Sequence, residues 1–308
     1  MAFIVHSYWP ELSWVIHQSE GIRQTLGEGF RYREFYLNTR QLPEAAYQPR
    51  VEEVIRQIQA THPQVVFITD DNALRLVGPF IDKSWVVFGG VNGSIREDFP
   101  WAAARNDVAG VLERPLVARS VVQIQSALGL SHSRVLVLAG TDETTTRMIH
   151  EEFGDQRVRT LPDGSSLRIE QSSSFSEWQN WIEKKEKEWD FVLVMGNMAL
   201  VDSKGQRVAE LDVARWIHDH SDQPVFTIHE QQIGKGLFDG GMVVSGRLMG
   251  RDMADLARQV LKEGKVPSVF DGRFRVQSEG LMLFSQSGLR QRGLSLTERA
   301  QRSAFLVD

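Results

Sequence analysis

The feature that most constrains this chain is an alternation of short apolar runs with segments of helical periodicity, repeated in two consecutive series. Such a pattern is typical of βαβ units around a mainly parallel sheet. The first series has apolar runs near 3–7, 32–37, 65–69, 86–89 and 108–112, with helical stretches near 12–26, 45–61 and 73–80. The second has helices near 116–128, 145–153, 175–188 and 211–219, and strands near 134–139, 167–171, 191–195 and 225–228. We therefore predict an α/β protein of two doubly wound, Rossmann-like lobes.

The segment after the second series indicates how the lobes are connected. Residues 240–245 precede a strongly amphipathic helix near 249–262, which Gly264 and Pro267 end. This remainder is too short to form a third domain. We therefore expect the chain to cross back, complete the first lobe and then return to the second. Between the strands of the second series, residues 201–208 are expected to form an exposed turn or hairpin.

Composition excludes several classes of function. The 308 residues suffice for two lobes, and the formal net charge is -5, with Lys and Arg scattered along the chain. A nucleic-acid partner is not expected, because its surface would need a basic stripe. The absence of cysteine excludes disulfides, thiolate catalysis and Cys-ligated zinc.

The sequence contains no apolar run of the roughly 20 residues that a membrane-spanning helix needs. Met1 and Ala2 lead directly into the first apolar strand, without a basic leader or a signal-peptide core. Two interpretations stay open: a cytoplasmic protein, or an exported one whose leader has been removed.

The residues that follow the strands are unusually polar. Ligands of open parallel sheets bind outside the carboxyl ends of the strands, so these positions are the first candidates for a binding site. They are Ser7-Tyr8-Trp9-Pro10, Thr69-Asp70-Asp71-Asn72, Gly89-Gly90-Val91-Asn92, Gly140-Thr141-Asp142-Glu143-Thr144-Thr145, Met195-Gly196-Asn197 and His229-Glu230-Gln231. The alternative is that some are helix N-caps, of which Asp71, Asn72 and Thr144 are the candidates.

Known catalytic and cofactor motifs are missing. Adjacent side chains on an extended segment point to opposite sides, so Asp70 and Asp71 need not converge; we expect one to face the ligand and the other to cap the following helix. The histidines show no metal-ligand spacing, and we predict no metal. GxGxxG, GxxxxGK[ST] and GxSxG are absent, and we predict no cofactor.

Two groups of aromatic residues differ in their expected roles. Trp178, Trp181 and Trp189 lie on or beside a helix with a Lys/Glu-rich face, where packing against a neighbouring helix is expected. Tyr8, Trp9 and Trp14 flank the first strand-to-helix turn. A ring there can stack on a ligand, although a packing role is equally compatible with the sequence.

The order of several short motifs resembles the substrate-binding proteins of ABC transporters, in particular the receptors for aromatic amino acids. The matching segments are 86–92 (VVFGGVN), 106–111 (NDVAGV), 240–241 (GG) with 250–254 (GRDMA), 260–264 (VLKEG) and 286–296 (QSGLRQRGLSL). Together they span nearly the whole chain.

This resemblance implies a type I periplasmic-binding fold. Lobe 1 would comprise residues 1–113 and 244–270, lobe 2 residues 114–243 and 271–308, and three strands of chain would form the hinge. Ligand-binding positions in the first lobe would be Ser7, Tyr8, Trp9, Trp14, Asp70, Asp71, Asn72, Gly90 and Asn92. Those in the second would be Thr141, Asp142, Thr145, Asn197, His229 and Glu230. Hydroxyls, amides and helix N-termini would hold a ligand carboxylate, and an acidic side chain would hold an ammonium group or hydroxyls.

The resemblance also implies a monomeric receptor, periplasmic or extracellular and associated with the membrane through a lost leader or a partner. It would close over a small polar ligand, such as an amino acid, and deliver it to an ABC permease without performing chemistry. One alternative is a ligand-sensing domain that acts on a membrane sensor or another signalling partner. The other is an α/β enzyme that uses Asp70, Asp71, His229 and Glu230.

Overall fold

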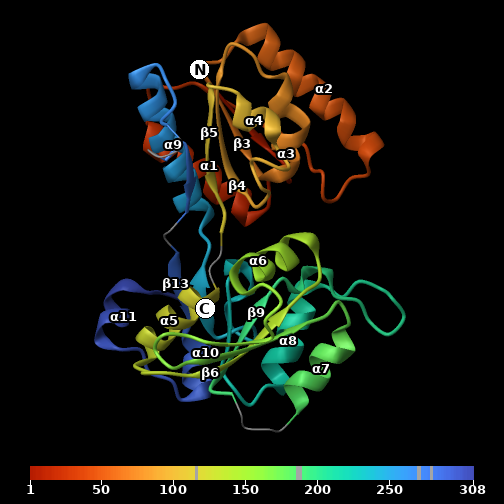
Figure 1. Ribbon diagram of the computed structural model, residues 1–308, viewed down its shortest axis with the longest axis vertical. Coiled ribbons are helices and arrows are strands. Elements are labelled where there is room, and N and C mark those ends of the chain that lie inside the picture. Colours follow the sequence, from red (N-terminus) through yellow and green to blue (C-terminus); the bar gives the residue numbers. More distant parts are fainter. Residues whose placement is uncertain (115–116, 185–188, 269–271, 278–279) are drawn as a thin grey trace. The chain divides into compact units, whose positions relative to one another are not determined.

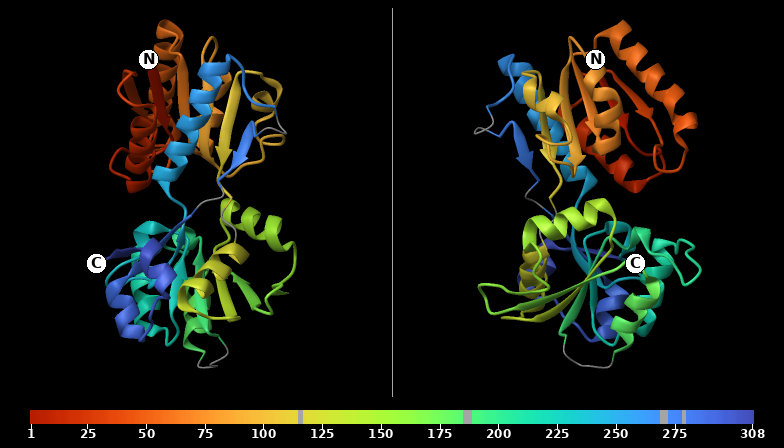
Figure 2. Two further views of the ribbon diagram at one scale, coloured as in Figure 1. Left: turned by 90° about the vertical axis from the view of Figure 1, so that its left-hand side faces the viewer. Right: turned by 45° about the vertical axis from the view of Figure 1, so that its right-hand side comes forward.

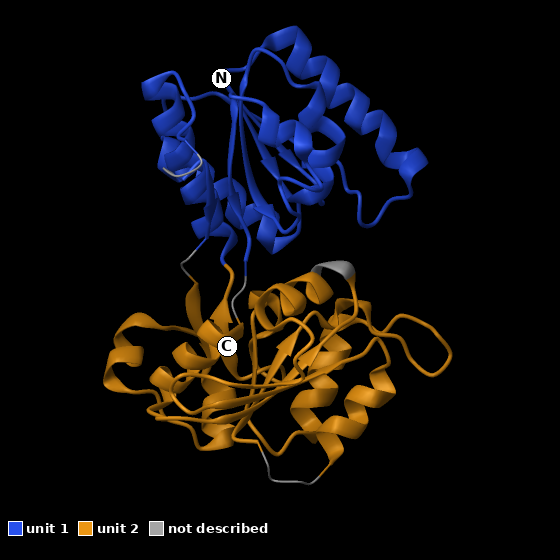
Figure 3. Cartoon of the chain, in the orientation of Figure 1, with its two compact units in different colours: residues 1–114, 245–279 blue, residues 115–244, 280–308 orange. Residues whose placement is uncertain are grey.

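The chain forms two units and passes between them three times (Figure 3). The first comprises residues 1–114 and 245–279, and the second residues 115–244 and 280–308. The computed structural model describes residues 1–114, 117–184, 189–268, 272–277 and 280–308, except the side chains of residues 143 and 144. Both units contain the predicted open α/β sheet (Figure 1).

The first unit is built around a parallel sheet of order β12-β5-β4-β3-β1-β2. Its strands are β1 (Ala2–His6), β2 (Tyr32–Tyr36), β3 (Val65–Thr69), β4 (Trp85–Val91), β5 (Val108–Leu112) and β12 (Phe274–Val276). Its helices are α1 (Ser13–Leu26), α2 (Glu44–Thr61), α3 (Asp70–Val77), η1 (Gly78–Phe80), α4 (Pro100–Ala104) and α9 (Gly246–Glu263).

Alternate side chains of each strand enter two separate cores in this unit, one on each side of the sheet. Phe3 and Val5 of β1 pack in the core formed with α2, α3 and α4. Ala2 and Ile4 pack in the core formed with α1 and α9. Figure 2 shows α9 lying along its face of the sheet. The central strands β3, β4 and β5 are almost entirely apolar because both of their faces are covered.

Helices α1 and α9 approach closely through glycine residues. A Cβ atom on Gly250 would lie 2.1 Å from the carbonyl oxygen of Gln18, and one on Gly21 would lie 2.2 Å from that of Arg247. No larger side chain fits at either contact without moving a helix. These glycines therefore fix the position of α1, whose residues reach the candidate site.

The second unit contains a sheet of order β14-β13-β11-β10-β9-β6-β8-β7. Its strands are β6 (Arg134–Ala139), β7 (Val158–Thr160), β8 (Ser166–Gln171), β9 (Phe191–Met195), β10 (Val225–Thr227), β11 (Gly240–Val243), β13 (Leu281–Ser285) and β14 (Phe305–Val307). Its helices are α5 (Val117–Leu128), α6 (Glu143–Phe153), α7 (Phe175–Glu183), η2 (Asn197–Ala199), α8 (Glu210–His220), η3 (Glu230–Gln232), α10 (Gln286–Arg292) and α11 (Glu298–Ser303). The pairs β7–β8 and β11–β13 are antiparallel, and the others are parallel.

The cores of the second unit again lie on opposite faces of the sheet. Val135 and Val137 of β6 pack with α5, α6, α10 and α11. Leu136 and Leu138 of the same strand pack with α7 and α8 around the fully buried Trp178. Trp181 and Trp189 are half-buried against this second core, in agreement with the expected packing role.

Three sequence predictions are corrected or limited by the structure. The segment 272–277, which we had assigned to the second lobe, belongs to the first unit because β12 pairs with β5. Helix α7 ends at Glu183, and the remainder of its predicted range, 185–188, lies outside the described residues, as does the predicted helix start at 116. Over the described part of the chain, no helix is both long and apolar enough to cross a membrane.

Candidate functional site

Strand order places the candidate site of the first unit beside β1 and β3. The strand order from the β2 edge is β2-β1-β3-β4-β5. The chain therefore adds β2 on one side of β1 and then reverses, adding β3, β4 and β5 on the other side, which places the switch point between β1 and β3. Ligands of doubly wound sheets bind outside the carboxyl ends of the strands at such a reversal. His6 and Thr69 are paired at that end, and Asp70 follows directly.

Asp70 is buried and has an unusual backbone. Its φ of 67° lies in the left-handed region, and its side chain is 4% exposed. Oδ1 accepts a hydrogen bond of 3.1 Å from Nε1 of Trp14. Oδ2 has no hydrogen-bond partner among the described residues. Burial, followed by the nearby Glu113 carboxylate, raises the pKa of Asp70 well above its ordinary value.

Gln18 of α1 lies beside Asp70, and the sequence analysis did not select it. Its side chain is fully buried, and neither amide atom has a hydrogen-bond partner within the described ranges. A Cβ atom on Gly90 would lie 3.0 Å from Oδ1 of Asp70, 3.2 Å from Nε2 of Gln18 and 3.3 Å from the Trp14 ring. These three side chains therefore converge over Gly90, whose φ of 73° also favours glycine.

Glu113 and Asn92 form a half-buried part of the same group. Burial, followed by the Asp71 carboxylate, raises the pKa of Glu113 to about 7, while a hydrogen bond with the Asn92 side chain and the charge of Arg114 oppose the shift. Oδ1 of Asn92 is buried and lacks a hydrogen-bond partner in the described structure. Glu113 follows β5 directly, and its acidic side chain was a signal that the sequence analysis passed over.

Two aromatic side chains that follow β1 are half-buried. The rings of Tyr8 and Trp9 meet edge to face, with centroids 6.3 Å apart. The Arg40 guanidinium lies 5.7 Å from the Tyr8 ring centroid, within cation–π range. Burial, together with the charge of Asp70, raises the pKa of the Tyr8 hydroxyl, which therefore stays protonated.

Other predicted positions in this unit make hydrogen bonds within the protein. Oγ of Ser7 donates to the Thr69 carbonyl at 2.8 Å and accepts from the Ala73 amide at 2.8 Å. The Asp71 carboxylate accepts from the amides of Asn92 at 3.1 Å and Gly93 at 2.8 Å, so it holds the loop after β4 and does not cap α3 as predicted. The side chain of Asn72 donates to Oγ1 of Thr39 at 3.0 Å and is likewise no N-cap.

The second unit has the corresponding reversal between β6 and β9. Thr141 is exposed there, and Asp142 is the N-cap of α6, where Thr144 had been the candidate; its Oδ1 accepts from the Thr145 amide at 3.0 Å. Oδ2 of Asp142 is buried without a hydrogen-bond partner in the described chain. Thr145 is buried, and a Cβ atom on Gly196 would lie 2.0 Å from its hydroxyl oxygen.

The remaining predicted residues of the second unit lie on the segments after β9 and β10. Asn197 is fully buried: its Nδ2 donates to the Glu210 carbonyl at 3.2 Å and its Oδ1 accepts from Nε2 of Gln232 at 2.7 Å. The backbone amide of His229 donates to Oγ1 of Thr227 at 3.3 Å. Glu230 is half-buried and begins η3.

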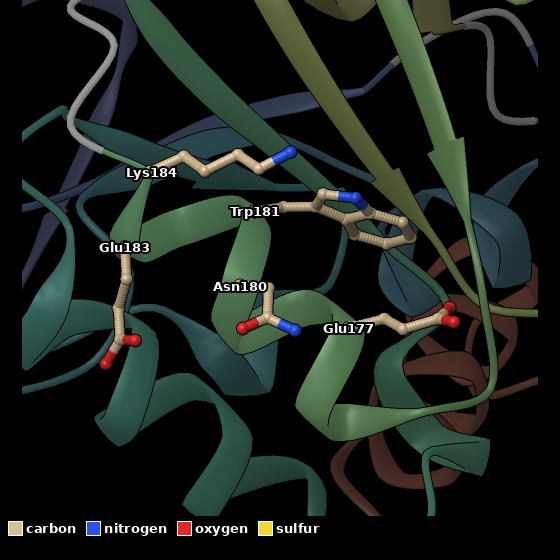
Figure 4. A pocket seen from close by; sticks show the side chains of 5 residues that line it. All are labelled: Glu177, Asn180, Trp181, Glu183 and Lys184. Atoms are coloured by element: carbon tan, nitrogen blue, oxygen red, sulfur yellow. The ribbon is translucent and has the colours of Figure 1, made fainter.

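A separate surface groove lies on α7 (Figure 4). It has a volume of about 560 Å³ and is lined by Glu177, Asn180, Trp181, Glu183 and Lys184. None of the predicted site residues lines it. No cluster of metal-ligating side chains occurs in the part of the chain that the structure describes.

These features define the class of fold. Each unit has the order 2-1-3-4-5 around its own switch point, and the chain passes between the units three times. The protein has the type I periplasmic-binding fold, as predicted.

Comparisons with solved structures agree with this fold. A substrate binding protein with adhesive properties from Clostridium difficile, in its ligand-free, open structure, has a TM-score of 0.68 and 11% identity, with 100% of this chain and 99% of that chain covered. The ABC domain in complex with L-Trp from Streptococcus pneumonia has a TM-score of 0.60 and 14% identity, with both chains covered fully. The 5-methylthioribose transporter solute binding protein from Thermotoga lettingae has a TM-score of 0.51 and 12% identity, covering 98% and 90%. No family model and no curated protein matches the sequence.

Proposed function

We propose that the protein is a solute-binding receptor for a small polar ligand. The observation that carries this proposal is the convergence of Gln18 and Asp70 over Gly90, each with a buried polar atom that lacks a partner in the described chain, at the switch point of the first unit. Leaving such an atom unpaired costs about 1–3 kcal/mol. A ligand that pairs with these atoms recovers that free energy.

The shared fold supports the proposal, because solved structures with this fold include proteins described as binding L-Trp and 5-methylthioribose. We further propose that Tyr8, Trp9 and Trp14 contact the ligand, and that an amino acid is one candidate for it. Thr141, Asp142, His229 and Glu230 are the proposed contacts from the second unit. Closure over the ligand stays a prediction.

We also propose that the receptor works outside the cytoplasm as a monomer, delivers its ligand to an ABC permease and binds it without chemical change. Binding alone is favoured over catalysis by Asp71, because both of its oxygens accept backbone hydrogen bonds. Use of the same fold as a sensor would require the same ligand contacts.

The test is a thermal-shift screen of amino acids, amines, sugars, polyols and organic acids, followed by calorimetry on each hit. A ligand present at 100 times its Kd raises the unfolding free energy by about 2.7 kcal/mol. We expect at least one saturable hit that is recovered unchanged after incubation with the protein. If no compound of the library shifts the transition, or if the hit is converted to a product, the receptor proposal is wrong.

A further inference from the structure

We propose that Gln18 of α1 selects ligands that carry a neutral cis-amide edge, meaning an N–H and a C=O group side by side, as in a lactam ring. This inference rests on the receptor function proposed above and names the chemical group that the first unit recognises. Gln18 is not among the contacts that the sequence resemblance implies. A neutral amide also differs from the carboxylate, ammonium and hydroxyl groups considered there.

The carboxamide of Gln18 is buried and unpaired at both of its polar atoms. The side chain is fully buried, and neither Oε1 nor Nε2 has a hydrogen-bond partner among the described residues. An amide group presents an acceptor oxygen directly beside a donor nitrogen. Because a buried donor or acceptor without a partner costs free energy, a ligand that pairs with both atoms gains more than one that pairs with either alone.

Groups that only donate or only accept hydrogen bonds satisfy half of this carboxamide. A ligand carboxylate accepts from Nε2 of Gln18 but leaves Oε1 unpaired, and an ammonium group donates to Oε1 but leaves Nε2 unpaired. A planar edge with a donor beside an acceptor forms two parallel hydrogen bonds with the carboxamide. Glutamine and asparagine bind the donor–acceptor edge of adenine in this way.

The surroundings of Gln18 suit a flat ring. A Cβ atom on Gly90 would lie 3.2 Å from Nε2 of Gln18, 3.0 Å from Oδ1 of Asp70 and 3.3 Å from the Trp14 ring, so the three side chains reach one point over a glycine. Oδ1 of Asp70 accepts the hydrogen bond from Trp14, and Oδ2 is left without a partner in the described chain. Asp70 therefore offers a third polar contact beside the amide edge, and the indole offers a flat apolar face.

Trp14 controls access to Gln18. The unpaired atoms of Gln18 and Asp70 are buried, whereas the Trp14 side chain beside them is only half-buried. A hydrogen bond of 3.1 Å from Nε1 to Oδ1 of Asp70 holds the indole in place. We expect the ring to leave Asp70 when a ligand enters and to stack on the face of the ligand. Binding then exchanges one hydrogen bond within the protein for two with the ligand.

Matched probes separate the amide edge from ring shape and charge. We would titrate the full chain by calorimetry at neutral pH with isocarbostyril, a bicyclic lactam, and with benzamide. N-methylisocarbostyril keeps the ring and the C=O group but lacks the N–H, and benzoate keeps the shape of benzamide but carries only acceptors. We expect each amide to bind at least about tenfold more tightly than its matched partner, which leaves a buried atom of Gln18 unpaired.

Two variants and a control on the same helix test the residues themselves. Gln18→Met removes both polar atoms and should abolish the preference for isocarbostyril over its methyl derivative without lowering the Tm of the unliganded protein, because no hydrogen bond within the described chain is lost. Trp14→Phe keeps a flat ring but cannot bond to Asp70, so it should bind isocarbostyril about threefold more tightly or better. Gln24→Met changes an exposed residue of α1 and should leave every affinity unchanged.

The outcomes distinguish this inference from the receptor function. Equal affinities for isocarbostyril and its methyl derivative, or no binding of either amide while another compound of the library binds, would overturn the cis-amide selection and leave the receptor function standing. A preference that survives in Gln18→Met would overturn the role of Gln18, and a lowered Tm in that variant would show that the carboxamide serves the folded protein itself. Weaker binding by Trp14→Phe would overturn the role of Trp14. No saturable hit in the whole library overturns both proposals.

Discussion

Replacing Asp71 by alanine should destabilise the first unit in the absence of any ligand. Its carboxylate accepts two backbone hydrogen bonds from the loop after β4, at 3.1 Å and 2.8 Å. Hydrogen bonds to charged groups contribute about 1.5–3 kcal/mol each, and the half-buried position of Asp71 favours the low end of that range. We expect a loss of about 2–3 kcal/mol in the free energy of unfolding.

This expectation differs from the interpretation of Asp71 as a ligand contact alone, because a residue that only contacts the ligand would not stabilise the unliganded protein. For a unit of about 150 residues, 2–3 kcal/mol corresponds to a fall in Tm of about 4–12 °C. Differential scanning calorimetry of the unliganded protein and urea denaturation both measure the change. Asp71→Asn is the matched control, because its amide oxygen keeps one acceptor and should lose less.

A Tm of Asp71→Ala within about 1 °C of the parent protein would refute the reasoning, since a shift that small corresponds to well under 1 kcal/mol. A stability loss equal for Ala and Asn would indicate that the negative charge, and not the number of acceptors, holds the loop after β4.

Three further predictions concern stability. Burial lowers the pKa of His6 to about 4, so the unfolded chain binds a proton at a higher pH than the folded protein does. In urea titrations, the free energy of unfolding should therefore fall by about 3 kcal/mol as the pH drops from about 6.5 to 4. A His6→Gln variant that keeps the full pH dependence would contradict this. Gly250→Ala should lose about 1–3 kcal/mol and weaken ligand binding, because its Cβ would push α1 away; the control Gly29→Ala meets open space and should be close to neutral. Arg292→Met should lose about 3–5 kcal/mol by leaving the fully buried Asp239 without its ion-pair partner, and an unchanged midpoint in urea would show that this pair contributes nothing.

The sequence predicted the architecture well because apolar strands and amphipathic helices leave local signals. Strands such as Val65–Thr69 and Phe191–Met195 are buried at every position and apolar except for Thr69, since both faces of the sheet are covered, and they lie where the sequence analysis expected them. The short strands near the end of the chain were harder to predict from the sequence. β12 has three residues and pairs with β5, which precedes it by more than 150 positions, so its partner leaves no local signal.

The candidate site was only partly predictable for a related reason. Asp70, Trp14, Gly90 and Asn92 follow strands or open a helix, and position alone selected them. Gln18 is a polar residue within a helix and would ordinarily face solvent. It is buried because α9 packs against α1 through Gly250, a contact between residues far apart in the sequence. Conversely, Ser7 and Asn197 have side chains of the kind that often contact ligands, but these side chains form hydrogen bonds within the protein.

The return of residues 245–277 to the first unit has a consequence for biosynthesis. A nascent chain of which residues 1–244 have emerged from the ribosome lacks both α9 and β12. The face of the sheet that carries Ala2, Ile4 and Phe67 then has only α1 of the two helices that bury it. The first unit therefore cannot complete its core, and exposes an apolar surface that chaperones can bind, until residues 245–277 have been translated. Truncation after residue 244 should yield aggregates instead of an isolated domain.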